Sequence, residues 1–439
     1  MRNINIMQGA AIQGDILSNF SMRRDNAQLV TRVSFGQKAD AQGRATLQAD
    51  PNFRLHYDGN IQGGDNLAVA IAGGATSLNG QHELYGLSVD PGATLSGNSS
   101  YTINPEDSFI NNGTLSPGNS FGQMSITGHF IQGPQGRILI EANTRQHDRI
   151  EVNGMAELAG ELHVQLQPDW YASDWSLSQD TVFQATQTQG TFDRLTATLA
   201  SPTLTVQTAA DGRWTVKRNP TAYSQYAANP NAAAVGRGLA QTSNDSQNLA
   251  PVYQALDFSN PNGSDINQGL DQLSAGAYGA QLAASLRREQ LVSEQLRQRP
   301  GLGKDGWQTF IQPFGGSYRW QLGRNDVDHR SHTYGVLFGA EHRASGSDWS
   351  LGLHATANEQ RLNMDSPFQA KSTLTGLGAG VHALYRADAR QGWSGAAQLR
   401  AGLTLHASER LRLGVSAGTR LLGNSRADVS GNASLNWAF

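Results

Sequence analysis

Residues 427–439 alternate without interruption between two faces of a strand. One face carries Asp428, Ser430, Asn432, Ser434 and Asn436, and the other carries Ala427, Val429, Gly431, Ala433, Leu435, Trp437 and Phe439. Segments that begin near Trp349, Trp393 and Leu411 repeat the pattern. These runs cover about 10–14 residues, whereas ordinary strands average about 5–6. The length and the strict period of two predict strands that each separate an apolar medium from a polar one.

Long strands with an apolar band on one face and polar or glycine residues on the other are typical of transmembrane β-barrels. A barrel satisfies every backbone hydrogen bond without water, so it can span lipid. Aromatic residues near the strand ends suit the two interfaces: Trp307, Trp320, Tyr334, Trp349, Tyr385, Trp393 and Trp437. The alternative is a soluble β-sandwich, which would favour shorter strands. We expect outer-membrane lipid around the apolar face.

The polar face of these strands contains histidines and arginines. His354, His382 and His406 are explained by solvation of a barrel lumen. Four arginines are the candidate lumen residues: Arg386, Arg400, Arg412 and Arg420. They form a solvated wall or, alternatively, favour anions or pair with acidic residues of a preceding helix.

Residues 1–217 are predicted to form short strands separated by glycine and asparagine turns. Pairs of apolar residues at a spacing of two recur at roughly 10–20 residues. Examples are Ile138 with Ile140, Ile150 with Val152, and Leu162 with Val164. The pattern favours the stacked rungs of a β-helix, with a β-sandwich as the alternative.

Residues 218–300 change in character, because alanine-rich segments replace the alternating strands. Apolar residues at three- and four-residue steps predict one helix from about Ile266 to Arg299, ended by Pro300-Gly301. About 30 helical residues reach roughly 45 Å, more than the roughly 30 Å hydrocarbon core of a bilayer. The helix is too polar to face lipid, so we expect it inside a pore or, alternatively, packed on a soluble domain.

Composition excludes several classes of protein. The formal net charge is −3, which argues against a nucleic-acid partner, since such proteins present a basic face. The chain has no cysteine, so disulfides and thiolate metal sites are excluded. No apolar run is long enough for a transmembrane helix. The first residues lack the apolar segment of a signal peptide, so we expect that an exported protein would carry a leader beyond this sequence.

Catalytic motifs do not emerge from the sequence. A Gly-x-Ser-x-Gly string from Gly118 to Gly122 falls in a predicted turn between strands, not in a strand-to-helix elbow. Ser108 is not followed by glycine, and the acidic neighbours of His56 and His82 in sequence do not make a triad. Zinc-binding and nucleotide-binding strings are missing too. We therefore expect no enzyme, no cofactor and no metal site in this chain.

Three stretches, taken together, resemble bacterial autotransporters (type V secretion). The segments Gly113–Ser120, Ser125–Phe130, Asp148–Gly154 and Leu158–Val164 are similar to the stem of the secreted passenger. Leu270-Asp-Gln-Leu-Ser-Ala-Gly-Ala-Tyr278 resembles the entry to the pore helix, and Leu435–Phe439 resembles the terminal strand of outer-membrane barrels. The resemblance covers residues from about 85 to 439.

The resemblance implies a mainly β protein with three parts. These are a right-handed parallel β-helix passenger with an autochaperone-like stem (1–217), a helical linker with the pore helix (218–300), and an outer-membrane β-domain (301–439). It implies export of the passenger to the cell surface, with or without later release, and help from the barrel assembly machinery and periplasmic chaperones. The implied pore-helix residues are Leu270, Leu273, Tyr278, Arg287, Arg288, Glu289 and Glu294. The implied assembly signal is Trp437 with Phe439.

The β-domain departs from the family in its strand count. A family barrel has twelve strands, but only about seven are counted here, beginning near Trp307, His332, Trp349, Ser372, Trp393, Glu409 and Ala427. Even an eight-stranded barrel is filled by its own side chains, so seven strands cannot close around a helix. We predict an open or incompletely closed sheet that curls partly around the helix. An odd count also puts the two ends of the sheet on opposite sides of the membrane.

Three functions follow from this reading. The first is a translocator that exports and displays its own passenger, although a shortened monomer should translocate poorly or be an inactive remnant. The second is the remnant of a peptidase or esterase whose catalytic domain lies upstream. The third is a surface adhesin made of the β-helix. We expect a monomer, and pairing of sheets between chains would be one way to close the barrel.

Overall fold

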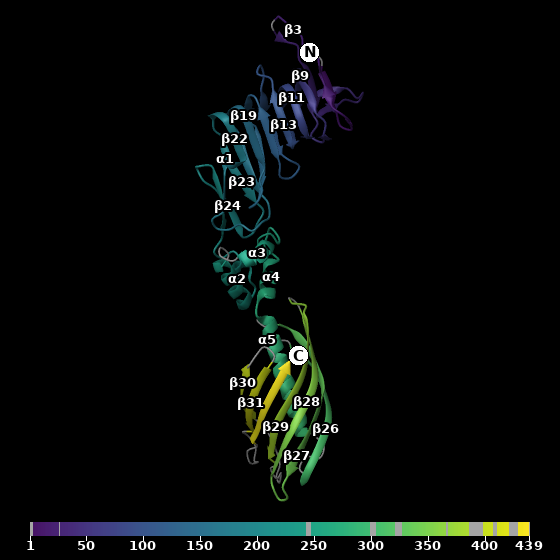
Figure 1. Cartoon of the computed structure of the whole chain (residues 1–439), viewed down its shortest axis with the longest axis vertical. Coiled ribbons are helices and arrows are strands. Elements are labelled where there is room, and N and C mark those ends of the chain that lie inside the picture. The colour runs from purple at the N-terminus through teal and green to yellow at the C-terminus, as the bar shows by residue number, and fades with distance from the viewer. Residues whose placement is uncertain are drawn as a thin grey trace. The chain divides into compact units, whose positions relative to one another are not determined.

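The computed structural model describes residues 3–25, 27–242, 247–298, 304–320, 327–365, 368–385, 398–406, 411–420 and 429–438. The chain forms two compact units, shown together in Figure 1. The first comprises Met1–Tyr226 with Gly236–Ile266, and the second comprises Ala227–Val235 with Asn267–Phe439. The domain boundaries inferred from the sequence, at 217 and 300, remain predictions.

The first unit is a solenoid of stacked parallel rungs. Its larger sheet contains β1 (Asn3–Ile6), β2 (Ile16–Leu17), β5 (Thr31–Phe35), β9 (Ile61–Ile71), β11 (Gly80–Val89), β13 (Ser99–Ile103), β14 (Phe109–Asn111), β16 (Gln123–Thr127), β17 (Phe130–Gln132), β19 (Arg149–Leu158) and β22 (Phe183–Gly190). Its smaller sheet contains β8 (Arg54–Tyr57), β10 (Ala75–Leu78), β12 (Thr94–Gly97), β15 (Thr114–Pro117), β18 (Arg137–Ala142), β20 (Glu161–Leu166) and β23 (Arg194–Leu199).

Each turn of the solenoid advances about twenty residues or somewhat more, as from Ala75 to Thr94 to Thr114. The register then stacks like side chains on like: Leu95 on Leu115, Leu115 on Ile138, and Ile138 on Leu162. All three predicted apolar pairs lie in one continuous core, and each of their side chains is at most 3% exposed. The predicted β-helix stem is confirmed.

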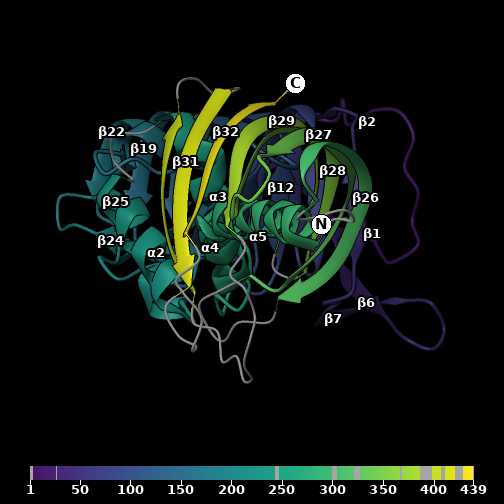
Figure 2. The same cartoon turned by 90° about the horizontal axis from the view of Figure 1, so that it is seen from below.

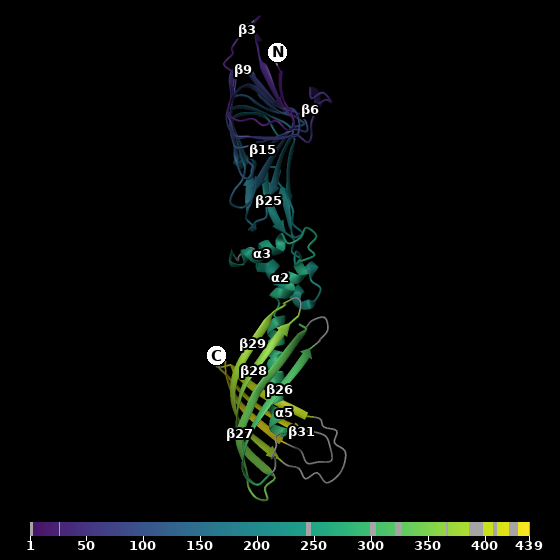
Figure 3. The ribbon, with the colours of Figure 1, turned by 90° about the vertical axis from the view of Figure 1, so that its right-hand side faces the viewer.

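Short antiparallel segments flank the parallel rungs at both ends of the solenoid. Two hairpins project from its first rungs, β3 (Arg23–Arg24) with β4 (Ala27–Gln28) and β6 (Gln37–Ala39) with β7 (Ala45–Ala49) (Figure 3). At the other end, α1 (Gln179–Val182) precedes β22, and β21 (Ser176–Ser178), β24 (Leu204–Thr208) and β25 (Arg213–Arg218) form a three-stranded sheet. Trp214 of β25 is fully buried in the solenoid core, so this sheet closes the apolar interior.

Helices follow the solenoid: η1 (Ser224–Tyr226), α2 (Pro230–Thr242), η2 (Gln247–Leu249) and α3 (Ala250–Asp257). Asp257 ends α3 and is completely buried. It accepts hydrogen bonds from Arg218 (2.5 Å), Tyr223 (2.7 Å) and Thr203 (2.6 Å). Removing one partner of such a buried pair would leave an uncompensated charge, so the cluster ties α3 firmly to the end of the solenoid.

The second unit contains α4 (Ile266–Leu273), α5 (Gly276–Gln298) and one antiparallel sheet. The single helix predicted from Ile266 to Arg299 is wrong, because Ser274 interrupts it. The Ser274 hydroxyl donates to the carbonyl of Asp271 (2.7 Å), and the Gly276 N–H donates to the same hydroxyl (3.4 Å). A side chain that competes for backbone hydrogen bonds in this way ends one helix and starts the next. None of the helices in the described part of the chain is both long and apolar enough to cross a membrane.

The sheet of the second unit has seven described strands in the order β26-β27-β28-β29-β32-β31-β30. Figure 2 shows them as an arc beside α5. Their bounds are β26 (Gly306–Trp320), β27 (His329–Arg343), β28 (Trp349–Met364), β29 (Lys371–Tyr385), β30 (Gln398–His406), β31 (Leu411–Arg420) and β32 (Val429–Ala438). The predicted count of about seven long strands is confirmed. The predicted starts at Trp393, Glu409 and Ala427 lie outside the described residues.

Candidate functional site: the sheet that holds α5

The register of β26–β29 sorts the side chains of their outer face into rows. Four consecutive rows are almost entirely apolar, and their larger members are strongly exposed: Trp307, Ile311, Phe338, Leu351, Leu353, Leu377 and Val381. Rows two residues apart are separated by roughly 6.6 Å along a strand, so the band spans about 20 Å or slightly more. A soluble protein rarely exposes so large an apolar surface. The band has the height and composition of a face that contacts lipid.

Polar rows border the apolar band at the end of the sheet where β26 ends. The outermost row contains Arg319, Arg330, Asn363 and Lys371, and the next contains Ser317, His332, Arg361 and Thr373. In the following row Tyr334 donates a short hydrogen bond to Glu359, which also pairs with Arg361 at 2.7 Å. The strands therefore continue beyond the apolar band into a polar medium at this end.

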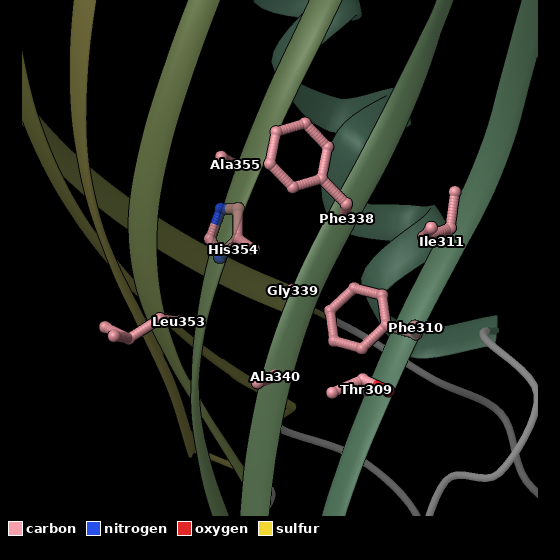
Figure 4. Close-up of a pocket in the computed structure, with 9 residues that line it drawn as sticks. All are labelled: Thr309, Phe310, Ile311, Phe338, Gly339, Ala340, Leu353, His354 and Ala355. Atoms are coloured by element: carbon pink, nitrogen blue, oxygen red, sulfur yellow. The ribbon is translucent and has the colours of Figure 1, made fainter.

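A shallow hollow of about 760 Å³ lies within the apolar band (Figure 4). It surrounds Gly339, and the neighbouring side chains include Ile311, Phe338 and Leu353. A side chain at Gly339 would come within 2.3 Å of the Leu353 carbonyl oxygen and 2.6 Å of the Phe310 ring, so no larger residue fits there.

The inner face of the sheet is polar, glycine-rich and yet buried. Its buried polar residues are His329, Ser331, Thr333, Glu341, Ser350, His354, Thr356, Gln360 and His382. On β29, Gly376, Gly378 and Gly380 occupy three successive inward positions. The small residues leave room for α5, and a side chain added at Gly376 would meet the Arg288 guanidinium at 3.5 Å.

Helix α5 packs along this inner face through two apolar clusters. Near its start, Ala280 and Ala284 contact Val327, Leu362 and Met364. Near its end, the side chains that pack together are Leu291, Val292 and Leu296 with Phe310, Phe314 and Leu337. The start also approaches the sheet closely, because a side chain at Gly276 would lie 2.8 Å from Val327. The helix is therefore held against β26–β28 over most of its length.

Hydrogen bonds fix the helix between these two clusters. Gln360 of β28 donates to the carbonyl of Ala284 (2.8 Å) and to the Thr333 hydroxyl (3.1 Å). Gln312 of β26 donates to the Gln295 side chain at 2.7 Å. The contacts of Gln360 and Gln312 with the helix were not predicted from the sequence. Their inward position in the alternation was visible, but which face of the helix they would meet was not.

The charged residues predicted for the pore helix pair mainly within α5. Arg287 lies 3.4 Å from Glu294 and stacks over the Tyr318 ring at 3.9 Å, and Arg288 lies 3.0 Å from Glu289. Leu270 is buried, while Leu273 and Tyr278 are 46% and 77% exposed. The role of these residues in a pore remains a prediction. Arg386 and Phe439 lie outside the described residues, as do the side chains of Arg400, Arg412, Arg420 and Trp437.

Two inward histidines depart from the expectation of a solvated lumen. His354 and His382 are 7% and 6% exposed, and their Nδ1 atoms are 3.2 Å apart. Glu341 lies 3.5 Å from His382, and the Phe310 ring packs against the same imidazole. The expectation is wrong for these two because the inward Phe310 ring and the facing histidine cover them. The side chain of His406 lies outside the described residues. The described residues contain no cluster of His, Cys, Asp or Glu that could hold a metal ion.

The described sheet is open. Within the described residues β26 pairs only with β27, and β30 pairs only with β31. Pro313 in the middle of β26 has no backbone N–H, and proline within sheets is confined to edge strands, strand starts or bulges. The predicted incompletely closed sheet is confirmed for this part of the chain.

The pairing registers show in which direction β26, β32 and α5 run along the sheet. One inner row runs Gln308, Glu341, Gly352, His382, Asn432, and a later one runs Phe314, Gly335, Asn358, Gly376, Ala438. Both β26 and β32 advance from the first row to the second, so they run the same way. Helix α5 runs the opposite way, since its end contacts Phe310 and its start contacts Val327. The end of β32 and the start of α5 therefore point to the same end of the sheet.

One polar array on the solenoid surface has the order of a hydrolytic triad. Ser108 lies 3.1 Å from Nδ1 of His129, whose Nε2 lies 2.9 Å from Glu157. The two backbone donors that would stabilise an oxyanion there are already engaged, since Ser108 N–H donates to Asp107 and Phe109 N–H donates to the His129 carbonyl. The array is a ladder between successive rungs, and spacings of 21 and 28 residues gave no sequence signal for it.

These features define the class of the C-terminal region. An apolar outer band, a buried polar inner face and a helix along that face are the elements of an outer-membrane sheet of the β-barrel type. Residues 309–435 match the family model described as the autotransporter beta-domain. The C-terminal part of the chain is thus an autotransporter beta-domain, a domain of the outer membrane that displays a passenger at the cell surface. No curated protein and no solved structure matches the chain.

Proposed function

We propose that this chain anchors itself in the outer membrane and displays its own β-solenoid on the outer side. The observation that carries the proposal is the pairing of a lipid-compatible outer band with α5 on the inner face of the same sheet. Along the chain, α5 lies between the solenoid strands and the strands of the sheet, as a passenger still attached to its anchor would require. The polar rows around Arg330 and the start of α5 would then mark the outer surface.

The proposal includes weak export by a single chain. A translocator needs a closed wall around the passing polypeptide, and α5 here packs on three strands of an open sheet. Unpaired backbone groups at the edges of β26 and β30 would face lipid, which is costly. We therefore propose that export requires help, from the barrel assembly machinery or from pairing with a second sheet.

The test uses the full chain behind a signal peptide in a Gram-negative host. Carbonate extraction of membranes tests anchoring, and protease added to intact cells tests display of the solenoid. We expect resistance to extraction together with a small, protease-accessible surface fraction. Recovery of a folded, soluble monomer would overturn the anchor. Complete surface display at low expression, where pairing between chains is rare, would overturn the inefficient-export part alone.

Of the two alternative functions, the adhesin has more support than the remnant of a peptidase or esterase. The solenoid presents long ladders of exposed polar side chains, such as Gln123 with Glu151 at 2.9 Å. In the Ser108 ladder, the backbone N–H groups of Ser108 and Phe109 are already engaged, so this array supplies no oxyanion site. Binding of the displayed solenoid to host-cell surfaces, compared with cells that display the anchor alone, would test the adhesin.

A further inference from the structure

Helix α5 exposes an apolar stripe on the side that faces away from the sheet. Tyr278, Leu282 and Leu286 follow one another at four-residue steps, so they lie on one face of the helix. Their exposed fractions are 77%, 57% and 58%. Ala280 and Ala284, on the opposite face, are buried in the cluster that holds the helix to the sheet. Large apolar side chains that stay exposed in a row mark a surface for a partner.

Small residues lie beside this stripe. Gly279 and Ala283 each follow a stripe residue by one position, and they are also four residues apart. A side chain built at Gly279 would meet nothing within 4 Å among the described residues, so packing within the chain does not require glycine there. Glycine inside a helix costs about 1 kcal/mol relative to alanine. Small residues spaced by four allow two helices to approach closely, which gives this glycine a role.

The open sheet has two free edges, at β26 and β30. Both strands run the same way as β32, since β30 and β32 are each antiparallel to β31. Half a turn about an axis along the strands brings β26 of one copy beside β30 of a second copy, at two identical seams. The strands then pair in parallel, and backbone groups that would face lipid acquire partners. Pro313 removes at most one donor from the fifteen-residue edge of β26.

Two such sheets form a barrel of fourteen strands, twice the seven described. Barrels of about eight strands are filled by their own side chains, and those of about 16–18 strands enclose a water-filled channel. Fourteen strands therefore leave room inside for about two helices, each roughly 10 Å across. Each α5 packs on the inner face of its own sheet, so the two uncovered faces meet across the axis.

We propose that two copies of this chain share one barrel, in which their α5 helices pack against each other through the stripe of Tyr278, Leu282 and Leu286. The inference rests on the proposed anchor function and names the partner that the open sheet needs. The second copy covers the stripe and both sheet edges at once, which neither lipid nor water does. It replaces the monomer expected from the sequence.

The chain contains no cysteine, so single cysteines can report this contact. Leu282→Cys and Leu353→Cys are introduced into the full chain, expressed behind a signal peptide and oxidised in isolated outer membranes. Leu353 is exposed to a similar extent (65%) but lies on the outer face, so it reports chance collisions. We expect disulfide-linked dimers for most of the Leu282→Cys chains and few for Leu353→Cys, because a disulfide needs Cβ atoms about 3.5–4.5 Å apart. Equal yields would overturn the proposal.

Leu286→Cys is tested in parallel, because a two-fold axis brings like residues together only near the point where the helices cross. Carbonate extraction of the same membranes separates this inference from the proposed function. A chain that resists extraction but forms no dimer at either position overturns the shared barrel and leaves the anchor standing. A soluble chain overturns both. Monomeric Leu282→Cys that reacts with a membrane-soluble maleimide assigns the stripe to lipid and also overturns the shared barrel.

A second measurement tests the close approach of the helices. Gly279→Leu should weaken dimerisation about tenfold, because overpacking a tight contact costs at least that much. Gly238→Leu is the matched control, since Gly238 of α2 is also an exposed helical glycine with open space around it. Energy transfer between labelled copies in liposomes, over a range of protein-to-lipid ratios, gives the dissociation constants. An unchanged constant for Gly279→Leu would overturn the helix contact.

Discussion

The solenoid and the C-terminal sheet are built from the same alternation of apolar and polar side chains, turned in opposite directions. In the solenoid, Ile138 and Ile140 face a dry core, and the polar residues between them face water. In the sheet, Leu351 and Leu353 point outward, and His354 and Gln360 are buried against the inside. The pattern within a strand therefore fixes only that two faces differ. The medium around the sheet decides which face is covered.

The two regions also satisfy their polar groups differently. In the solenoid, side chains such as Asn111 and Gln132 pair between successive rungs (2.8 Å). In the sheet, Gln360 and Gln312 reach across to α5. The solenoid is thus stabilised by contacts between successive rungs, as expected of a repeat protein. The sheet depends on one helix, and this dependence can be tested by mutation.

The largest effect should come from a charge in the solenoid core. Ile140→Asp buries an unpaired carboxylate among fully buried side chains, which should cost roughly 4 kcal/mol or more. Urea unfolding of the solenoid, followed by limited proteolysis, measures the loss. Leu139→Asp is the matched control on the outer face of the same strand. Comparable destabilisation by both changes would contradict the assignment of faces.

The second effect is a pair of opposing pH dependences within the solenoid. Burial raises the pKa of Asp148 to about 7, although Gly122 and Glu141 donate backbone hydrogen bonds to it. Burial lowers the pKa of His82 to about 4. From pH 7 to 4, the folded state gains roughly 3 kcal/mol through Asp148, which takes up a proton, and loses roughly 3 kcal/mol through His82, which stays largely neutral until the pH approaches 4. We expect nearly flat stability over this range.

The variant His82→Asn should expose the Asp148 dependence. Asn keeps an acceptor for the Ile61 N–H, which donates to His82 at 3.2 Å, but it does not titrate. Stability of the variant should therefore rise as the pH falls from 7 to 4. Unfolding midpoints in urea at half-unit pH steps measure this. A flat profile in the variant would show that Asp148 does not titrate in this window.

The third effect tests the lipid-facing side of the sheet. Val381→Arg places a charge within the apolar band and should cost about 2–4 kcal/mol in a bilayer. Thr373→Arg introduces the same side chain on the same strand and face, in a polar row, and should cost little. Folding into liposomes across a urea series compares the two variants. If the Thr373 variant lost as much stability as the Val381 variant, the band would be misplaced.

The smallest effect concerns the hydrogen bonds that hold α5 against the sheet. Gln360→Ala removes two hydrogen bonds, one to the helix and one to Thr333, and should cost about 1–2 kcal/mol. Faster amide exchange at residues 276–298 would report release of the helix. Gln369→Ala, in the loop before β29, serves as the control and should leave exchange in α5 unchanged.

The sequence alone predicted the features that depend only on the residues of a single strand. The strands after Trp349 and the buried pairs around Ile140 follow from alternation, which each strand carries by itself. Which strands pair and which side chains lie together was not predictable in this way. The pairing of β32 with β29, and the burial of His354 beside His382, depend on residues far apart in the chain. The helix break at Ser274 was missed because a single hydroxyl competes locally with an otherwise regular pattern.

The same distinction applies to the candidate site in the sheet, where some features were predictable from the sequence and others were not. The polar inner face was visible in the sequence, but the contact of Gln360 with Ala284 requires the helix to be docked at one rotation. A hollow of the solenoid between β1, β2, β5 and β9 was not predicted from the sequence. It depends on where the chain leaves the rung between β2 and β5, and no periodic pattern encodes that departure.

The parallel course of β26 and β32 carries a consequence for how such a domain can arise. Sheets that gain or lose whole hairpins change by two strands, and the chain then always leaves on the side where it entered. An odd number of strands cannot be reached by such steps. It requires a cut between a strand that rises and one that descends, so that the outer two strands in chain order run the same way. Among the described strands, β26 and β32 do so, and both end at the end of the sheet where α5 starts.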